Sequence, residues 1–431
     1  MGKRYADMNA DERKAELKRL EAKLEEVRAR GLKLNMTRGR PGSGQLDQVN
    51  DLITILSQED HLSEDGSDCR NYGGLTGIPE IRRAFAEVLG IDAANLIVQD
   101  NSSLNIMYTL ILHALTFGVP GGDAPWGQNP KRAFLCPAPG YDRHFAITEH
   151  LGFDLITVPM TATGPNMDMV EKLVAGNANI KGIWTVPVYS NPDGIVYSEE
   201  TCRRLATMKT AAPDFRIIWD NAYVVHHLYP DQPELCGSVP EILALCAEAG
   251  HPDRVLQVAS FSKVTFPGSA PACLAASKTN LDWYLGHIQF RTISPNKMMQ
   301  LAHVRFLEKR GGIANVMRGH ADVLRPRFEM VLKILRENLA DSGLAEWHEP
   351  KGGYFISVNL RPGLAQATVN LAKQLGVAFT PAGATYPRNN DPSDSNIRLA
   401  PTLPTTDELK TAIEVFCLCV RYCALTEGNA K

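Results

Sequence analysis

Ala259-Ser260-Phe261-Ser262-Lys263 decides the fold of this chain, together with the upstream stretch Arg216-Ile217-Ile218-Trp219-Asp220-Asn221-Ala222-Tyr223. In each stretch an apolar run of strand length ends at polar residues. Buried strands of this kind present their last side chains at the carboxyl edge of a sheet, where α/β folds bind ligands. We therefore expect one strand end to deliver an acid, Asp220, and the other a lysine, Lys263.

Lys263 stands beside serines in a strand-ending turn, which makes it a candidate Schiff-base nucleophile. An amine can form an imine with a carbonyl compound, and burial lowers the pKa of a lysine toward a usable value. A buried aspartate such as Asp220 needs a cationic partner. The ring nitrogen of pyridoxal phosphate (PLP) is one such partner, and a lysine with an acid on that nitrogen is the usual PLP arrangement. For either motif alone, a surface lysine or a helix-capping aspartate is the competing interpretation.

Composition and charge describe an ordinary globular chain. Its 431 residues are 44% hydrophobic and 22% charged, which is enough for one large and one small domain. The net charge of -3 and the pI of 6.4 give no electrostatic argument for a nucleic-acid or membrane partner. No apolar run is long enough to span a membrane, and residues 1–30 are charged and lack a signal-peptide core, so we expect a cytoplasmic protein.

The nine cysteines are scattered along the chain, and their odd number argues against a disulfide framework. Cys417, Cys419 and Cys423 cluster on the expected last helix. They have no nearby histidine and no CxxC spacing, so we expect buried small hydrophobic side chains and no metal site.

Strand-length apolar runs alternate with helical periods through the middle of the chain. The expected strands are 96–99, 132–136, 154–159, 180–188, 216–220, 255–259 and 273–277. This alternation predicts an α/β fold with a mostly parallel seven-stranded sheet covered by helices. Mixed strands and helices follow a long helical stretch and predict a smaller α+β domain. We place the large domain at 52–310 and build the small domain from 1–51 and 311–431.

Turns at the expected strand ends add candidate binding residues. The turn 100–105 leads into a helix, so backbone N–H groups and two hydroxyls meet at a helix N-terminus that suits a phosphate. N-capping by Ser102 or Ser103 is the alternative there. Tyr141, at the end of the loop 137–140, either stacks on a flat ring or lies in the core. The segment 34–42 carries two arginines and either passes an anionic ligand or is a plain basic loop.

Taken in order, these motifs resemble those of the fold-type I PLP enzymes, in particular the class I aminotransferases and, within them, the bacterial aspartate-aminotransferase-like subgroup. The resemblance spans nearly the whole chain and rests on residues 37–41, 69–75, 101–105, 136–145, 189–192, 219–223, 260–263 and 396–401. It implies the aspartate aminotransferase fold, with a large PLP-binding domain and a smaller α+β domain. The implied reaction moves an amino group between an aspartate- or glutamate-like amino acid and a 2-oxo acid.

Residue roles follow from the same resemblance. It implies that Lys263 forms the internal aldimine with PLP and later acts as the base at the substrate Cα, while Asp220 pairs with the ring nitrogen. Tyr223 and Asn191 are implied as hydrogen-bond partners of the phenolic oxygen, and Tyr141 as the residue that stacks on the ring. The residues implied around the phosphate are Asn101, Ser102, Ser103, Ser260 and Ser262.

Other roles concern the substrate and a second subunit. Tyr72 resembles the residue that reaches the phosphate from the neighbouring subunit, which implies a homodimer with shared active sites. Arg398 resembles the residue that clamps the substrate α-carboxylate, because its planar fork matches a carboxylate. Gly39 and Asn191 are also implied as substrate-binding residues.

Three positions depart from the family pattern. Pro271 stands eight positions after the lysine, where many class I relatives have a phosphate-binding arginine, so hydroxyls and backbone or another basic residue must bind the phosphate. Asp193 and Arg291 replace a smaller and a neutral residue of the aspartate-type subgroup. Our hypothesis is that Arg291 or Lys297 meets a distal anionic group of the substrate, and a surface salt bridge is the alternative.

Two other activities compete with amino-group transfer. Elimination, replacement or ring formation, as in relatives resembling aminocyclopropane-carboxylate synthases that act on S-adenosylmethionine, needs the same cofactor residues. A regulatory protein that uses PLP as a ligand usually carries a DNA-binding module, and the sequence shows no basic helix-turn-helix pattern. The sequence does not identify the amino donor or the acceptor.

Overall fold

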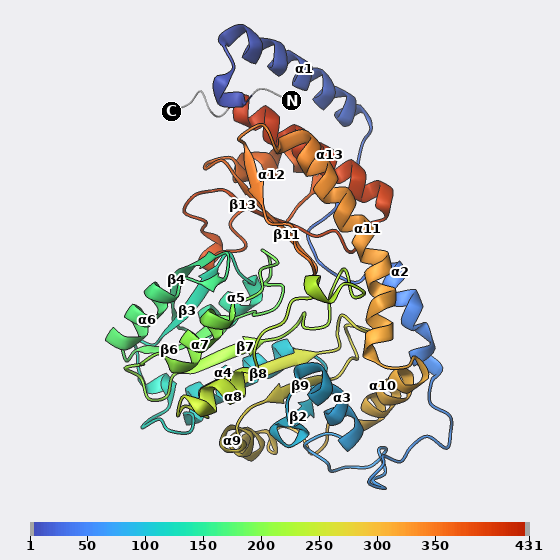
Figure 1. The fold of residues 1–431 in the computed structure, drawn as a ribbon, viewed down its shortest axis with the longest axis vertical. Helices are drawn as coiled ribbons and strands as arrows, with labels where there is room; N and C mark the ends of the chain where they lie inside the picture. Colours follow the sequence, from blue (N-terminus) through green and yellow to red (C-terminus); the bar gives the residue numbers. More distant parts are fainter. Residues whose placement is uncertain (1–3, 427–431) are drawn as a thin grey trace.

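The main layer of the protein is an eight-stranded sheet. The computed structural model describes residues 4–426 and orders these strands β2-β9-β8-β7-β6-β3-β4-β5 (Figure 1). Neighbours from β8 to β4 run parallel, while β2, β9 and β5 pair antiparallel. The strands are β2 (Leu96–Gln99), β3 (Ala133–Ala138), β4 (Asp154–Thr161), β5 (Gly164–Pro165), β6 (Ile180–Thr185), β7 (Arg216–Asp220), β8 (Val255–Ser260) and β9 (Ala272–Ala275). All seven expected strands are therefore present, and the eighth is the two-residue β5.

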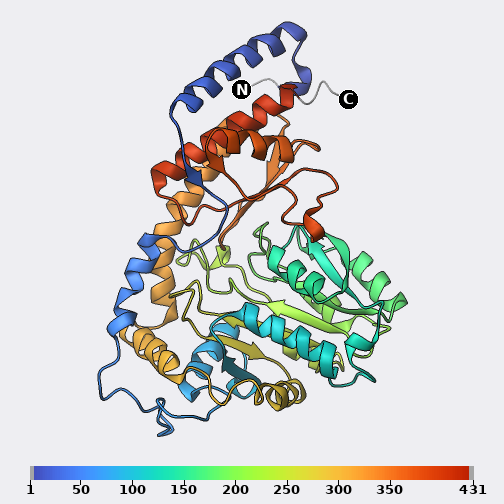
Figure 2. The same cartoon turned by 180° about the vertical axis from the view of Figure 1, so that it is seen from behind.

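Helices cover both faces of this sheet (Figures 1 and 2). One apolar core lies between the sheet and α4 (Ser103–Phe117), α5 (Asp142–His150) and α9 (Lys278–Ile288). A second core lies on the other face, against α3 (Pro79–Leu89), α6 (Met167–Gly176), α7 (Glu199–Thr207), α8 (Ile242–Glu248) and α10 (Lys297–Lys309). In β7, Ile217 and Trp219 belong to the second core and Ile218 to the first. Since side chains alternate along a strand, Asp220 projects to the face of Ile218 and α5.

A third core joins the two ends of the chain. It packs β10 (Ala345–Trp347), β11 (Ile356–Leu360) and β13 (Asn396–Leu399), a three-stranded antiparallel sheet, against helices from both ends. β1 (Leu34–Asn35) pairs in parallel with β12 (Val377–Ala378). The helices are α1 (Ala10–Ala29), α11 (Ile313–Leu339), α12 (Ala365–Gln374) and α13 (Thr406–Thr426), with the short α2 (Ser43–Leu46) leading toward the large sheet.

The N-terminal segment is tied to the C-terminal part by charge as well as by strand pairing. Arg421 of α13 donates to Glu16 of α1 at 2.6 Å and to the Tyr5 hydroxyl at 2.8 Å. Both views place α1 alongside α13 at one end of the molecule (Figures 1 and 2). These contacts agree with a small domain built from both ends of the chain, and its limits at 52 and 310 stay a prediction.

The remaining sequence expectations concern the cysteines and the membrane. All nine cysteines are free thiols, and Cys417, Cys419 and Cys423 are buried in the third core. Between residues 4 and 426, no cluster of His, Cys, Asp and Glu side chains could hold a metal ion. The helices in that range include none with the length and apolarity needed to cross a bilayer. A cytoplasmic location stays a prediction from the sequence.

Candidate active site

Asp220 and Lys263 meet at the carboxyl edge of the large sheet. β7 ends at Asp220, and its parallel neighbour β8 ends at Ser260, so the residues that follow both strands leave the sheet at the same edge. Both side chains line one cavity of about 190 Å³. The other polar residues around this cavity come from the start of α4, from the three loops that follow β3, β6 and β7, and from the end of β8 and the turn after it: Ser102, Ser103, Tyr141, Asn191, Tyr223, Ser260 and Ser262.

Asp220 is buried, and only one of its two carboxylate oxygens has a hydrogen-bond partner among residues 4–426. His144 of α5 lies with Nε2 3.0 Å from Asp220 Oδ2, while Oδ1 has no partner among residues 4–426. The His144 ring is itself fixed by stacking on Trp184, with ring centroids 4.5 Å apart. A buried carboxylate oxygen without a donor is unfavourable. Asp220 is therefore suited to a cationic N–H group that enters the cavity.

Lys263 is held between two aromatic rings. Its Nζ lies 4.7 Å from the centre of the Tyr223 ring and 6.0 Å from that of Tyr354. Burial lowers the pKa of Lys263, and the charge of Asp220 opposes this shift only in part. A lowered pKa raises the fraction of neutral amine near pH 7, and the neutral amine is the nucleophile.

Two phenols in the same cavity remain protonated at neutral pH. Burial raises the pKa of Tyr223 well above its usual value, and burial with the neighbouring Asp220 raises the pKa of Tyr141 to about 12. Both hydroxyls therefore keep a proton that they can donate to a ligand. Tyr141 also contacts His144 edge to face, with ring centroids 5.0 Å apart.

Serine hydroxyls gather at the N-terminal end of α4. Ser102 caps this helix, because its Oγ accepts from the Leu104 N–H at 3.1 Å, and the Ser260 hydroxyl donates to that of Ser262 at 3.2 Å. A capped helix N-terminus with free N–H groups nearby attracts anions. Among residues 4–426, no arginine lines this cavity, and Lys263 is the one basic residue that does.

Asn101 and Arg291 lie in a neighbouring cavity. This second cavity, of about 490 Å³, is also lined by Pro271 and does not include Lys263. The Asn101 side chain donates to the Gly268 carbonyl at 2.9 Å. Arg291 forms an ion pair with Asp100 and donates to the Thr109 hydroxyl at 3.3 Å. Within one chain, the structure thus separates both residues from the lysine.

Arg398 adjoins the lysine cavity through Asn191. Its Nη1 donates to Asn191 Oδ1 at 3.2 Å and to Asp142 Oδ1 at 3.0 Å, while its buried Nε has no partner in the described chain. The guanidinium lies 4.8 Å from the centre of the Phe355 ring. A Cβ added at Gly39 would lie 2.5 Å from the same ring. Gly39 thus permits the N-terminal loop to pack against the aromatic ring beside Arg398.

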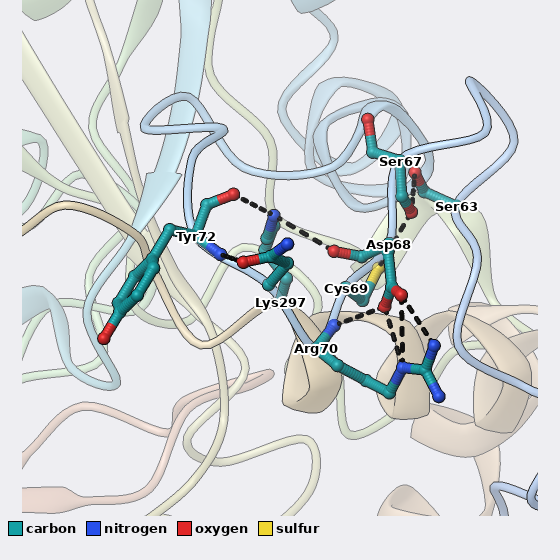
Figure 3. A network of polar contacts seen from close by, with 8 residues as sticks. Ser63, Ser67, Asp68, Cys69, Arg70, Tyr72 and Lys297 are labelled. Carbon is teal, nitrogen blue, oxygen red and sulfur yellow. Dashed lines mark hydrogen bonds and ion pairs between the residues drawn. The ribbon is translucent and has the colours of Figure 1, made fainter.

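Lys297 and Tyr72 belong to one loop network (Figure 3). Lys297 is buried, and its Nζ donates to the backbone carbonyls of Tyr72 at 3.3 Å and Asp68 at 3.5 Å. Asp68 pairs with Arg70 at 2.7 Å. The Tyr72 side chain points away from this network and is 78% exposed. Lys297 therefore supports the loop that carries Tyr72, and neither residue lines the cavity of its own Lys263.

Several residues near the site were not assigned a role from the sequence. His144, Asp142 and Tyr354 belong to this group, although His144 lies within a stretch that carries the family resemblance. Its position one helical turn after Tyr141 was the available signal. Asp193 was noted only as a departure; it is buried, its Oδ1 has no partner in residues 4–426, and burial raises its pKa to about 7.

Comparisons with known proteins identify the family and the fold of this chain. The aspartate amino-transferase family matches residues 8–430. The aspartate aminotransferase of Corynebacterium glutamicum is 45% identical over 405 residues, covering 94% of this chain and 93% of that protein. The crystal structure of an aspartate transaminase from C. glutamicum has a TM-score of 0.93 at 43% identity and covers 98% of both chains. An α-aminoadipate aminotransferase from Thermus thermophilus, complexed with N-(5'-phosphopyridoxyl)-L-leucine, shares the fold at 20% identity, with a TM-score of 0.71 and coverage of 93% of this chain and 95% of that one.

Proposed function

The chain belongs to the aspartate amino-transferase family, and from this premise we propose that it moves the amino group of an aspartate- or glutamate-like amino acid to a 2-oxo acid, with PLP bound at Lys263. The enzyme is a transferase of the aminotransferase class. The observation that carries the proposal is the shared cavity of Lys263 and Asp220, in which one buried carboxylate oxygen lacks a partner.

The residues of the cavity fit PLP. When bound, PLP supplies a cationic ring that withdraws electrons from the bonds of the attached amino acid. Asp220 Oδ1 would accept from the protonated ring nitrogen, and His144 keeps the carboxylate oriented through Oδ2. Tyr223 and Asn191 would donate to the phenolic oxygen. The hydroxyls at the start of α4 and after β8 would bind the phosphate in place of the arginine that Pro271 replaces.

Lys263 has two roles in this proposal. Its lowered pKa favours the neutral amine, which is the form that would hold the cofactor. Lys263 Nζ would also take a proton from the substrate Cα. Tyr223 and Tyr354 flank the Lys263 Nζ and limit the directions in which it can move.

Arg398 would bind the substrate α-carboxylate. Burial of Arg398 and the ring of Phe355 restrict its orientation, and its Nε still lacks a partner. The ion pair with Asp142 compensates the positive charge of the guanidinium in the absence of substrate. A carboxylate ligand would compete with Asp142 for the same group. Arg291, paired with Asp100, would meet a distal anionic group only through the site of a second subunit.

We also infer a homodimer with shared active sites. The support is the position of Tyr72, which is largely exposed on a loop held by Lys297 and has no role in the cavity of its own chain. Phe290, 87% exposed, and Ile293, 64% exposed, lie in the segment just before Lys297 and leave apolar surface beside that loop.

The test is a panel of amino acids added to the purified holoenzyme, read by visible absorbance and by 2-oxo acid formation. Aspartate or glutamate should remove the absorbance near about 420 nm and yield the matching 2-oxo acid. Lys263→Ala should abolish both signals, whereas Lys278→Ala, on the surface of α9, should change neither. Loss of a β- or γ-substituent from a substrate, for example the thioether group of S-adenosylmethionine, with recovery of the absorbance and no amino-group transfer, would refute the proposal.

A further inference from the structure

Tyr354 links Lys263 to the smaller part of the molecule. It lies just before β11 and is buried. Its ring centre is 6.0 Å from Lys263 Nζ, and its hydroxyl donates to the backbone carbonyl of Lys263 at 3.4 Å. One side chain therefore contacts both the reactive end and the main chain of the lysine.

The hydroxyl of Tyr354 is fixed in turn by Gln45 from α2. Gln45 Nε2 lies 3.0 Å from the Tyr354 hydroxyl oxygen and 2.8 Å from His320 Nδ1 of α11. All three side chains are buried. Burial lowers the pKa of His320 to about 4, so the ring is neutral at pH 7 and Nδ1 can accept. Gln45 thus uses both amide hydrogens as a donor, and Tyr354 is left to donate to Lys263.

Backbone pairing places Tyr354 relative to Tyr223. The Leu228 N–H donates to the Lys351 carbonyl and the Gly353 N–H to the His226 carbonyl, both at 2.9 Å. The ring of His226 contacts Tyr223 and Tyr354 edge to face, with centroids 5.6 Å apart in each case. His226 therefore connects Tyr223 and Tyr354, the two tyrosines whose rings flank Lys263.

We propose that Tyr354 and Gln45 form a positioning chain that sets the main chain of Lys263, and with it the direction of Nζ. The chain runs from Gln45 N–H to the Tyr354 hydroxyl and on to the Lys263 carbonyl, and neither side chain lines the lysine cavity. Through Gln45 and His320, the N-terminal segment and α11 help to position the lysine. This inference rests on the proposed function, because it assigns a task to the lysine of that same site.

Loss of the Tyr354 hydroxyl removes a donor from the Lys263 carbonyl and an acceptor from one Gln45 N–H. The turn after β8 can then shift, and a displaced base reacts more slowly, since misplacement by about 1 Å can cost roughly 100-fold in rate. For Tyr354→Phe we expect kcat to fall about tenfold, because the ring is retained and the displacement is smaller. KM should stay within about twofold, because Arg398 is held by Asp142, Asn191 and the Phe355 ring.

The experiment uses the full-length protein and two readouts. The first is kcat and KM of the holoenzymes, and the second is the rate at which apoprotein and PLP develop the visible absorbance of the lysine-bound cofactor. The variants are Tyr354→Phe, Gln45→Leu and the double variant. Gln48→Leu is a matched control on the same segment, since the Gln48 side chain donates to the Gly319 carbonyl of α11 at 3.2 Å. Tyr284→Phe removes a buried hydroxyl that has no partner in the described chain.

We expect both single variants to lower kcat and the rate of cofactor attachment, the double variant to be no worse than either, and both controls to match wild type. Additive losses, a change in KM alone, or wild-type values in Tyr354→Phe would each overturn the positioning chain. If one single variant fails to fold, the other decides by the same two readouts. If the wild-type enzyme attaches PLP but transfers no amino group, the proposed function is wrong. The attachment rates of the variants would still test the positioning of Lys263 by Tyr354 and Gln45.

Discussion

At the scale of single residues, Asp220 depends on a neighbour that binds one of its two oxygens. His144 stacks on Trp184 and binds one oxygen of the carboxylate, which leaves the other oxygen facing the cavity. The stack fixes the imidazole plane, and the hydrogen bond fixes the carboxylate plane. The direction in which Asp220 meets a ligand is therefore set before the ligand arrives.

His144→Phe should keep the stack and remove the hydrogen bond. A hydrogen bond to a charged group contributes ~1.5–3 kcal/mol, so we expect kcat to fall by about tenfold to a hundredfold and the affinity for PLP to weaken. The measurement is kcat with saturating amino acid, alongside a PLP titration of the apoprotein. His150→Phe, at an exposed position of the same helix, is the control. Equal activity of the two variants would remove His144 from the site.

Asp193 should make stability depend on pH. Burial raises its pKa to about 7, whereas an aspartate in the unfolded chain titrates near about 4. The folded state therefore binds more protons between these values, so stability is intact at low pH and is lost as the pH rises toward 7. Asp193→Asn removes this loss.

The melting temperature of Asp193→Asn minus that of wild type should grow from about pH 4 to about pH 7 and then level off, with about 1 °C for each kcal/mol recovered. Thermal unfolding at several pH values measures it. Asp322→Asn, at an exposed carboxylate of α11, should show a difference that does not follow this curve. A difference for Asp193→Asn that is constant from pH 4 to pH 8 would contradict the assignment.

At the scale of secondary-structure elements, the start of α4 does two jobs. Ser102 caps the helix, and the same turn presents hydroxyls and N–H groups to the lysine cavity. The sequence left N-capping and phosphate binding as alternatives for this turn. In the structure, Ser102 both caps α4 and lines the lysine cavity.

Ser102→Ala should therefore weaken both stability and cofactor binding. Loss of an N-cap costs about 1 kcal/mol, and loss of a phosphate contact should raise the dissociation constant of PLP by about tenfold. Ser198→Ala is the matched control, because Ser198 caps α7 through the Thr201 N–H at 3.1 Å, outside the residues that line the cavity. Thermal unfolding and PLP titration separate the two effects. The same PLP affinity in both variants would exclude Ser102 from the phosphate site.

How far the sequence alone could go is also clearest at this scale. Strand ends such as Asp220 could be predicted, because an apolar run that stops at a polar residue has one common meaning in an α/β fold. The contact between His144 and Asp220, or between Gln45 and Tyr354, could not, because it joins segments far apart in the chain. For Asn101, the sequence predicted the turn before α4 but not the side-chain direction, because this side chain lines the second cavity and donates to the Gly268 carbonyl.

At the scale of the whole molecule, the site is assembled from parts of the chain that are distant in sequence. β13 supplies Arg398, the segment before β11 supplies Tyr354, α2 supplies Gln45, and the large sheet supplies the lysine and the acid. An exposed tyrosine on a supported loop then points to a contribution across a subunit boundary. Activity should therefore require assembly of two chains.

Co-expression of two inactive variants tests this directly. A dimer of a Lys263→Ala chain with a Tyr72→Phe chain contains one site with both changes and one with neither, provided that Tyr72 acts in the neighbouring site. Activity of the co-expressed pair should then exceed the mean of the two parent enzymes. The control pairs Lys263→Ala with wild type, whose activity should follow subunit composition. A co-expressed pair that only averages its parents would place Tyr72 in its own subunit or outside the site.

The central claim is that Lys263, opposite Asp220, is the residue that binds the cofactor. Borohydride reduction of the holoenzyme, followed by proteolysis and mass spectrometry, tests it most directly, because reduction fixes PLP on the amine that holds it. We expect the mass of the reduced pyridoxyl phosphate on the peptide that contains Lys263, and no label on that peptide without reduction. A label on another lysine, or no label on any peptide after reduction, would contradict the claim.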